Sequence, residues 1–187
     1  VVERAGSETF ADQVRRRIVE PLGLTTLRPD YQWESIDHRA VGYRTRRGRV
    51  VRSTDTDVSW KLGGGGYLSN IGDMAAYAAG LINGRLVSKA TEQAMWTVQE
   101  TSDGRMTGRG LGFFLGSCDG AMEVSHNGAQ EKTKTRLVIY PRERNGIVFM
   151  TNSEYANPTR FVEVVQRALD ETPGDMLVGP SPTDSCE

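Results

Sequence analysis

His126 is the residue whose type and neighbours point most directly to chemistry. It ends an alternating apolar stretch and runs straight into Asn127, Gly128 and Ala129. Ser125 and His126 are neighbours on a predicted strand, so their side chains face opposite ways and cannot act as nucleophile and base for each other. An imidazole, with an ordinary pKa of about 6.5, can serve as acid, base or hydrogen-bond donor at neutral pH. From the residues alone, the more conservative interpretation is a histidine at a strand end, satisfied by a backbone carbonyl.

The common nucleophile motifs are absent from the chain. No serine has glycines two residues before and two residues after it, as in a nucleophile elbow, and no serine is followed by a lysine three residues later. The glycine run at residues 63–66 lacks the Gly-Lys-Ser/Thr ending of a phosphate loop, and no strong strand precedes it. We therefore interpret the run as a loop that needs positive φ angles or a close backbone approach.

Composition and charge exclude several classes of protein. The 187 residues hold 23 Lys and Arg against 24 Asp and Glu, so the formal net charge is −1 and the surface as a whole does not attract nucleic acid or an anionic membrane. The sequence contains no apolar run approaching the ~18 residues of a transmembrane segment. Two cysteines and two histidines offer neither a disulfide framework nor a metal-ligand spacing, so we expect no metal and no cofactor.

A local cluster of arginines interrupts this charge balance. Five arginines lie between residues 44 and 52, around a turn predicted at Arg47-Gly48, and three more stand at residues 15–17. We interpret them as a solvated charged face, with contact to an anionic partner as the alternative. Apart from Tyr43, no aromatic residue is interleaved with the hairpin arginines, which argues against stacking on nucleic-acid bases.

Start and stop signals divide the chain into helices and strands. Ser7, Asn70 and Ser88 are predicted N-caps, and Asn157-Pro158 opens the last helix. The predicted helices cover residues 8–19 (ended by Pro21 and Gly23), 71 to about 83, 89 to about 96, and the segment from 158 onward. The predicted strands cover residues 41–44, 49–51, 111–116, 122–126, 135–140 and 146–151.

Helices come first, then consecutive strands, then a helix, and the short links between the strands suit antiparallel neighbours. This order predicts an α+β fold in which an antiparallel β-sheet is flanked by helices. Residues 1–171 are predicted to form one structural unit, and residues 172–187, rich in Pro, Ser and Asp, a flexible tail. Residues 1–6 read as the end of a helix whose beginning is absent, closed by Gly6, so we interpret the chain as the C-terminal part of a longer polypeptide.

Five short blocks of sequence carry a further signal. They read Phe-Ala-Asp and Ile-Val-Glu-Pro-Leu-Gly-Leu within 10–24, Gly-Gly-Gly-Tyr-Leu-Ser-Asn-Ile-Gly-Asp-Met at 64–74, Gly-Leu-Gly-Phe at 110–113, His-Asn-Gly at 126–128, and Leu-Val-Ile-Tyr-Pro followed by Gly-Ile-Val-Phe-Met-Thr-Asn within 137–152. In this order and at these spacings the chain resembles the C-terminal half of the serine β-lactamase-related family, which includes class C β-lactamases, penicillin-binding DD-peptidases and esterases.

The resemblance implies acyl transfer through a serine ester. In this family the serine of a Ser-x-x-Lys motif attacks a carbonyl, and a tyrosine or serine of a second motif assists proton transfer. A third motif, Lys/His-Thr/Ser-Gly, lines the pocket from an edge strand. On this chain His126 matches the first position of that motif, Asn127 the second and Gly128 the third, and Ala129 would supply a backbone N–H to the oxyanion hole. His126 and Ala129 are thus the expected catalytic residues, and Asn127 and Gly128 the expected substrate-binding residues.

The chain departs from the family pattern in two ways. Asn127 stands where the family usually has a hydroxyl residue, so the substrate preference is expected to differ. The first two motifs are missing, because the Tyr67-Leu68-Ser69 sequence belongs to the glycine-rich block and is not assigned the role of the catalytic tyrosine.

The resemblance therefore implies, for residues 1–171, the C-terminal portion of a serine hydrolase that is inactive alone because its nucleophile lies on a missing N-terminal half. We expect that half, or a second copy of the chain, as partner, since a fragment of this sheet would expose an edge and an apolar face. The expected substrate is a small ester, amide or β-lactam, not nucleic acid, and the resemblance alone favours an extracytoplasmic location. The alternative is a non-catalytic binding or regulatory relative of the same fold.

Overall fold

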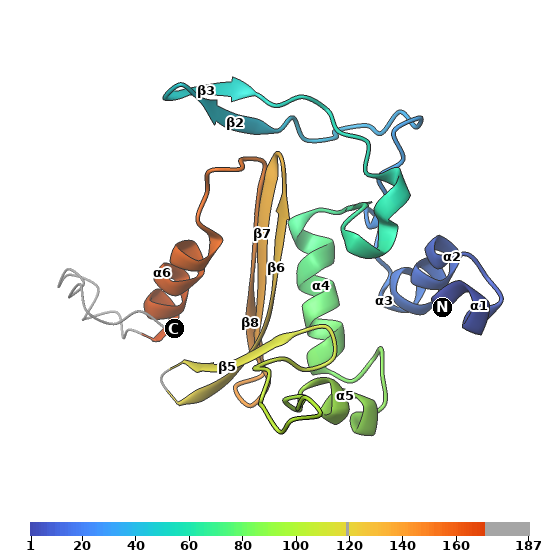
Figure 1. Ribbon diagram of the computed structural model, residues 1–187, viewed down its shortest axis with the longest axis vertical. Helices are drawn as coiled ribbons and strands as arrows, with labels where there is room; N and C mark the ends of the chain where they lie inside the picture. The colour runs from blue at the N-terminus through green and yellow to red at the C-terminus, as the bar shows by residue number, and fades with distance from the viewer. Residues whose placement is uncertain (119, 171–187) are drawn as a thin grey trace.

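The centre of the fold is a four-stranded antiparallel sheet with one long helix on each face. The computed structural model describes residues 1–118 and 120–170, so the predicted tail at 172–187 lies outside the described residues. Figure 1 views the sheet edge-on, with α4 (Ile71–Ile82) on one side and α6 (Pro158–Asp170) on the other. In spatial order the strands are β5 (Phe114–Cys118), β6 (Ala121–Gln130), β7 (Thr133–Tyr140) and β8 (Asn145–Thr151). The α+β prediction is confirmed, and β5 begins three residues later than predicted.

Alternation along the strands explains the two-sided core. Val124 and Ile139 face α4 and are fully buried, together with Ala78 and Leu81 of that helix. The residues in between face the other way, and Val138 packs with Val162 of α6 in a second cluster. Burying an aliphatic side chain of this size stabilises the fold by about 1.5–3 kcal/mol, so the paired clusters hold both helices to the sheet.

The helices beside the sheet begin where the sequence predicts. The Asn70 side chain accepts a hydrogen bond from the Asp73 N–H (2.8 Å) at the start of α4. The Ser88 hydroxyl accepts one from the Thr91 N–H (3.2 Å) at the start of α5 (Lys89–Met95). Each cap satisfies an amide that the first helical turn leaves unpaired.

The N-terminal segment differs from the single predicted helix over residues 8–19. It forms α1 (Val2–Gly6), α2 (Phe10–Val14), a π-helical turn (Arg15–Val19) and α3 (Glu20–Leu22). Thr9, not Ser7, caps α2, and Ser7 instead ends α1 with a left-handed backbone (φ 54°). Gly6 is the last helical residue, so the predicted cap is displaced by one position. The helical path continues through Pro21 and stops at Gly23, whose φ of 66° is left-handed.

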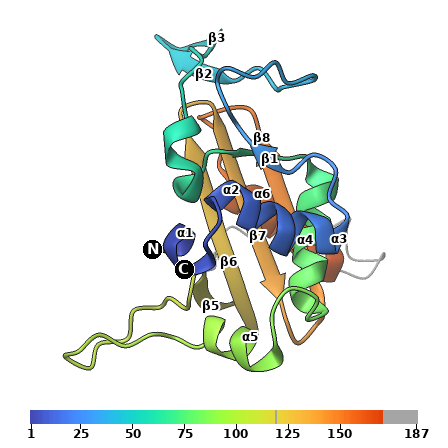
Figure 2. The same ribbon diagram turned by 90° about the vertical axis from the view of Figure 1, so that its right-hand side faces the viewer.

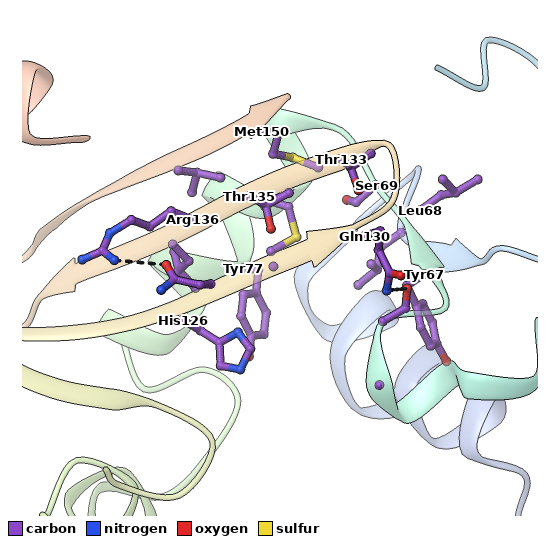
Figure 3. Close-up of a pocket in the computed structure, with 18 of the residues that line it drawn as sticks. Tyr67, Leu68, Ser69, Tyr77, His126, Gln130, Thr133, Thr135, Arg136 and Met150 are labelled. Atoms are coloured by element: carbon purple, nitrogen blue, oxygen red, sulfur yellow. Dashed lines mark hydrogen bonds between the residues drawn. The ribbon is translucent and has the colours of Figure 1, made fainter. Parts of the chain in front are cut away.

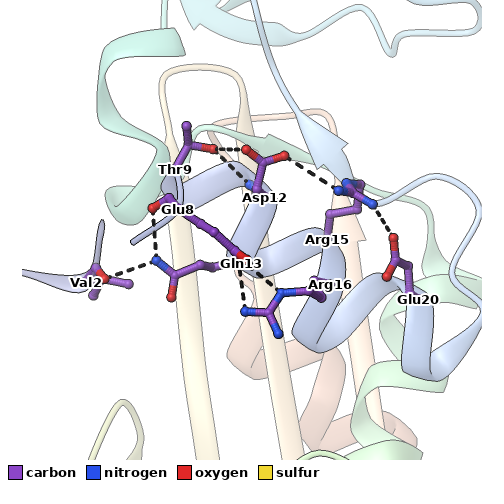
Figure 4. A network of polar contacts seen from close by, with 8 residues as sticks. All are labelled: Val2, Glu8, Thr9, Asp12, Gln13, Arg15, Arg16 and Glu20. Atoms are coloured by element: carbon purple, nitrogen blue, oxygen red, sulfur yellow. Dashed lines mark hydrogen bonds and ion pairs between the residues drawn. The ribbon is translucent and has the colours of Figure 1, made fainter. Parts of the chain in front are cut away.

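A polar network holds these short helices together (Figure 4). The buried Gln13 side chain donates to the carbonyls of Val2 (3.0 Å) and Glu8 (3.1 Å), which ties α1 to α2. On the exposed side Arg16 pairs with Glu8 (3.0 Å) and Arg15 pairs with Glu20. The network therefore combines one buried anchor with surface ion pairs, and the buried anchor contributes more because solvent does not screen it.

Two smaller antiparallel strand pairs complete the fold. β1 (Arg28–Pro29) pairs with β4 (Tyr67–Leu68), and β4 follows the 3₁₀ turn η2 (Ser59–Gly64) along the chain. β2 (Tyr43–Arg46) and β3 (Arg49–Arg52) are joined by the predicted two-residue turn, in which Arg47 (φ 49°) and Gly48 (φ 73°) both have positive φ. Such a turn matches the twist of the two strands. Figures 1 and 2 place this hairpin at one end of the molecule, beyond β6 and β7.

One edge of the sheet and one helix face have no partner among the described residues. β8 pairs along its length with β7 alone. On α6, Phe161, Val164, Val165 and Leu169 are 44–64% exposed, so the apolar stripe that they form stays largely outside the core. The sequence-based expectation of an exposed sheet edge and an exposed apolar face is thus confirmed for the described residues. No described helix has the length and apolar character needed to cross a bilayer.

Asp73 links the N-terminal segment to α4. Its carboxylate accepts hydrogen bonds from the N–H groups of Thr25 (2.9 Å), Thr26 (2.6 Å) and Leu27 (3.0 Å) and from the Thr26 hydroxyl (2.8 Å). Burial disfavours the charged form, but the hydrogen bonds from Thr26, Leu27 and Thr25 outweigh it and lower the pKa of Asp73. The ionised carboxylate therefore holds a loop 46 to 48 residues away against the start of the helix.

We expect Asp73→Ala to lower the free energy of unfolding by about 3 kcal/mol at neutral pH, because three backbone donors lose a charged acceptor. Since the pKa is lower in the folded protein, this stabilisation is present above the ordinary pKa of 3.8 and disappears as the pH falls through the folded value. Chemical unfolding at neutral and acidic pH measures both effects. The exposed Asp37→Ala is the matched control, and equal losses for the two variants would contradict the assignment.

Candidate active site

The predicted site residues lie on the half of β6 that β5 does not cover. β5 pairs with β6 from Cys118↔Ala121 to Phe114↔Ser125, and β6 then continues for five residues alongside β7 only. His126 is therefore in the middle of a strand, and the expectation that it ends one is wrong. The stretch from His126 to Gln130 has a neighbouring strand on one side and an open edge on the other.

The geometry of the β6–β7 turn determines which backbone groups face the open edge. Gln130 and Thr133 flank a two-residue turn and form the first pair of the ladder. In an antiparallel pair, successive residues direct their N–H and C=O groups alternately toward the partner and away from it. Gln130, Gly128 and His126 thus bond with β7, and the N–H and C=O groups of Asn127 and Ala129 point out of the sheet at the open edge.

Side chains alternate in the other direction, between the two faces of the sheet. His126, Gly128 and Gln130 share the α4 side with Val124, as Figure 3 illustrates for His126. A Cβ on Gly128 would overlap with Thr135 Oγ1, so only glycine fits opposite that threonine. The Thr135 hydroxyl thus occupies the space that a side chain at position 128 would take, and Thr135 lines the cavity there.

Asn127 faces the opposite side, where it joins a charged network that sequence reasoning missed. Arg136 donates to Asn127 Oδ1 (3.0 Å) and to Glu123 Oε1 (2.7 Å). The Arg136 and Glu123 side chains are only 13% and 14% exposed, so this ion pair is better protected from solvent than a surface pair. An arginine within an otherwise apolar predicted strand was the one signal that could have pointed to it. Arg136 therefore orients the Asn127 side chain by donating a hydrogen bond to its amide oxygen.

The open edge borders a cavity of about 750 Å³ between the sheet, α4 and the N-terminal helices. One part of its lining is apolar and the other is polar. Apolar side chains of α2, the π-helical turn and α4 form one part, including Phe10, Val14, Ile18 and Met74. The segment from His126 to Gln130 and the three glycines at 63–65 form the polar part.

Gln130 fixes the glycine-rich wall opposite the open edge. Its side chain accepts a hydrogen bond from Lys61 Nζ (2.8 Å) and donates to the Gly65 carbonyl (3.3 Å), as Figure 3 shows for the second contact. Gly65 has a φ of 122° and Gly66 would place a Cβ against the Val58 carbonyl. The interpretation of the glycine run as a loop that needs positive φ or close backbone approach is confirmed at Gly65 and Gly66, whereas Gly63 and Gly64 belong to η2 and show neither feature. The wall presents backbone rather than side chains to the cavity.

The turn that follows Gln130 adds a second connection to the same region. Lys132 Nζ pairs with Asp55 (2.7 Å), and the Thr56 hydroxyl donates to Glu131 (2.6 Å). The hydrogen bond and charge of Lys132 lower the pKa of Asp55. The β6–β7 turn therefore holds the segment before the glycine wall at two further points.

His126 is not the satisfied histidine of the conservative interpretation. Its side chain is exposed and has no hydrogen-bond partner among the described residues. Its ring lies 6.2 Å from the Phe114 ring, centroid to centroid. Figure 3 places Tyr77 on the same side of β6, and burial raises the pKa of the Tyr77 hydroxyl. The imidazole is thus available to a group that enters the cavity.

Tyr67 also lines the cavity, but its environment opposes a role as base. Burial, followed by the nearby Tyr31 and Asp12, raises the pKa of its hydroxyl to about 12. A tyrosine that takes a proton from a nucleophile needs a lowered pKa. Its ring instead packs edge-on against Phe10, at 6.3 Å between centroids. This supports leaving the catalytic tyrosine role unassigned on this chain.

The serine in the cavity lining is Ser69, and it lacks the features of a nucleophile. Its hydroxyl donates to the neighbouring Asn70 carbonyl (3.4 Å), and no lysine follows it at the spacing of one helical turn. The described residues thus provide an open edge, a histidine and a glycine wall, without a paired hydroxyl and base.

Solved structures of penicillin-binding proteins and amidases share this fold. The octameric penicillin-binding protein homologue from Pyrococcus abyssi matches with a TM-score of 0.75 and 22% identity, covering 93% of this chain and 41% of that one. The D-amino acid amidase from Ochrobactrum anthropi SV3 matches with a TM-score of 0.73 and 18% identity, covering 90% and 54%. The D-stereospecific amidohydrolase from Streptomyces sp. gives 0.72 and 19%, covering 87% and 49%.

Sequence comparison agrees with these structures. The candidate penicillin-binding protein PbpX of Bacillus subtilis (strain 168) is 24% identical over 115 residues, which are 62% of this chain and 28% of that protein. The chain thus spans about half or less of the length of the proteins it matches. The family model described as Beta-lactamase matches residues 1–171. The chain therefore belongs to the β-lactamase family.

Proposed function

We propose that this chain forms one wall of the acyl-transfer site of a serine hydrolase that cleaves an amide, ester or β-lactam bond. The observation that carries the proposal is the open edge of β6, where the Ala129 and Asn127 amides border the cavity without a strand partner. Attack of a hydroxyl on a carbonyl places negative charge on the carbonyl oxygen, and a fixed N–H aimed at that oxygen lowers the barrier by about 3 kcal/mol.

Ala129 is the proposed oxyanion donor. Residues two apart on a strand are separated by about 6.6 Å, so the Ala129 and Asn127 amides cannot both bind one oxygen. The Ala129 N–H would take the carbonyl oxygen, and the Asn127 backbone would bind a more distant part of an extended substrate. Between them, the Thr135 hydroxyl lies over Gly128 on the cavity side and can bind the substrate as well. This arrangement favours substrates with an amide that can align along a strand edge.

His126 is the proposed acid–base or hydrogen-bonding group. It lies on the cavity side of the same strand, is exposed and has no partner among the described residues. A group in that position can donate to the substrate or relay the proton of the attacking hydroxyl. The amidase names among the structural neighbours make amides a reasonable first substrate class to test.

The N-terminal half of the protein is the proposed source of the nucleophile and the proposed partner of this chain. An apolar lining on one part of the cavity suits a polypeptide segment that buries its own apolar side chains there. The open β8 edge and the exposed α6 face offer two further surfaces for the same half. A hydroxyl at the polar end of that segment would lie beside the open edge of β6.

A non-catalytic binding protein of the same fold is the second candidate. Asn127 replaces the usual hydroxyl residue, and Arg136 already occupies its side-chain oxygen. A site that retains the glycine wall and the open edge could bind an amide without cleaving it.

Labelling with an activated-serine probe tests the assignment of the nucleophile. We expect no stoichiometric adduct on this chain alone, and an adduct on the other polypeptide when the N-terminal half is co-expressed and purified with it. A serine adduct on this chain would contradict the assignment. If the two halves form a complex that binds an amide analogue of the probe but gives no adduct, the result supports the second candidate function, a non-catalytic binding protein.

His126→Ala in the assembled protein is expected to lower the rate of acyl transfer about ten- to a thousandfold, the range for losing a positioned donor or proton-transfer group. Steady-state and single-turnover kinetics on an amide substrate measure the change. His38→Ala, at the other histidine of the chain, is the matched control. Unchanged turnover in His126→Ala would assign this histidine no part in the reaction.

Gly128→Ala is expected to lower the free energy of unfolding by about 1–3 kcal/mol, because its methyl group would meet the Thr135 hydroxyl. Adding Thr135→Ala removes the clash and should restore most of the stability. Turnover of the double variant should remain reduced about tenfold or more, since the methyl group still stands beside the acyl group. Recovery of both stability and turnover would show that Gly128 serves packing alone.

A further inference from the structure

The β2–β3 hairpin concentrates positive charge at one end of an otherwise acidic chain. Residues 43–54 contain five arginines and no acidic residue, within a chain whose formal net charge is −1. Figures 1 and 2 agree that this hairpin extends beyond the end of the sheet, away from the helices that flank it. All of its arginines except Arg44 are exposed, so most of its charge faces solvent.

The arginines near the tip are clustered, and no acidic residue accompanies them in the hairpin. Arg46, Arg47 and Arg49 make no ion pair with a described carboxylate, whereas Arg16 pairs with Glu8 and Arg39 with Asp30. Surface arginines that only solvate a protein are commonly interspersed with acidic residues, as they are here outside the hairpin. The tip instead keeps three guanidinium groups available for an external anion.

Exposed apolar and aromatic side chains lie on the other face of the hairpin and in the loop before it. Val50 is 57% exposed and Tyr43 39% exposed, and the register of the hairpin puts both on one face together with Arg52. Arg46 and Arg49 pair with each other on the opposite face. The loop before β2 carries Trp33, which is 73% exposed and stacks on Tyr31 at 4.7 Å between ring centroids. A hydrated polyanion would leave these side chains in water, while the interface of a bilayer accepts both aromatic rings and arginines.

The base of the hairpin is fixed to the sheet. The Tyr43 N–H donates to the Asn152 carbonyl (2.8 Å), and the Glu154 N–H donates to the Tyr43 carbonyl (3.0 Å). The Asn152 side chain also donates to the Val41 carbonyl (2.8 Å). Because the base is held and the turn has the twist of its strands, the tip keeps one orientation relative to the sheet.

We propose that the β2–β3 hairpin docks the protein onto a bilayer that contains anionic phospholipid. Arg46, Arg47 and Arg49 bind the phosphate oxygens of the headgroups, for which the planar guanidinium is well suited. Val50, on the opposite face of the hairpin from Arg46 and Arg49, enters the interfacial layer with the tip. This places the cavity at a fixed height above the membrane and does not depend on which reaction the cavity supports.

Co-sedimentation with vesicles tests the proposal on the full chain. Binding is expected to vesicles that mix phosphatidylcholine with phosphatidylglycerol, to weaken as salt is raised, and to be absent with phosphatidylcholine alone. The triple variant Arg46→Gln, Arg47→Gln, Arg49→Gln should lower the partition coefficient about a hundredfold. The triple variant Arg4→Gln, Arg17→Gln, Arg142→Gln removes the same charge from other exposed sites and should bind nearly as well as the unaltered chain.

Val50→Ser separates a bilayer from a soluble polyanion. It should weaken vesicle binding severalfold and leave retention on inorganic polyphosphate unchanged, because only the bilayer interacts with the apolar side chain. Equal losses in the two arginine variants would overturn the role of the hairpin. Binding of polyphosphate or duplex DNA without binding of anionic vesicles would overturn the membrane as partner. Circular dichroism of each variant, matched to the unaltered chain, ensures that a loss of binding does not reflect misfolding.

Discussion

The site depends on one offset between neighbouring strands: β5 pairs with β6 only as far as Ser125. Had β5 continued, it would have taken up the Asn127 and Ala129 amides, and β6 would have no free edge. The chain is kept away by a tight turn before β5, in which the Gly110 N–H donates to the Phe113 carbonyl (2.9 Å). A Cβ on Gly110 would collide with the Met95 carbonyl, so this departure of the chain requires glycine.

The open edge is useful only because its surroundings are held. Gln130 and Lys132 connect the end of β6 and its turn to the segment at 55–65, and Asp73 connects α4 to the loop at 25–27. Both sets of contacts join parts of the chain that lie more than 40 residues apart. Each combines a charged group with several partners, which makes it stronger than a single surface ion pair. The cavity walls are therefore positioned by polar contacts between distant segments, and its apolar part by α4 and the N-terminal helices.

Local signals in the sequence predicted the elements well, and long-range contacts account for what they missed. Asn70 and Ser88 could be predicted as caps because an N-cap acts only on the first turn of its own helix. The four strands of the sheet could be predicted from the alternation of apolar and polar residues. The position of His126 within β6 could not be predicted, because residues 127–130 lack the alternating apolar pattern and continue the strand only through pairing with β7. The same holds for Arg136, whose partners are 9 and 13 residues away, and for Gln130, whose partners are 65 and 69 away. The sequence therefore indicated the segment 126–129 as the candidate site, but it did not indicate the contacts that form the walls of the cavity.

The size and polarity of the cavity bear on what could fill it. A drug-sized ligand needs a pocket of a few hundred Å³ with mostly apolar walls and a few placed polar groups. At about 750 Å³ the cavity is at the larger end of that range, and its polar groups are gathered on one part of its lining. A small substrate at the open edge would leave the part lined by Phe10, Val14 and Met74 unfilled, at a cost in lost packing. Under the proposed function, a polypeptide segment would fill that part and the substrate would occupy the remainder.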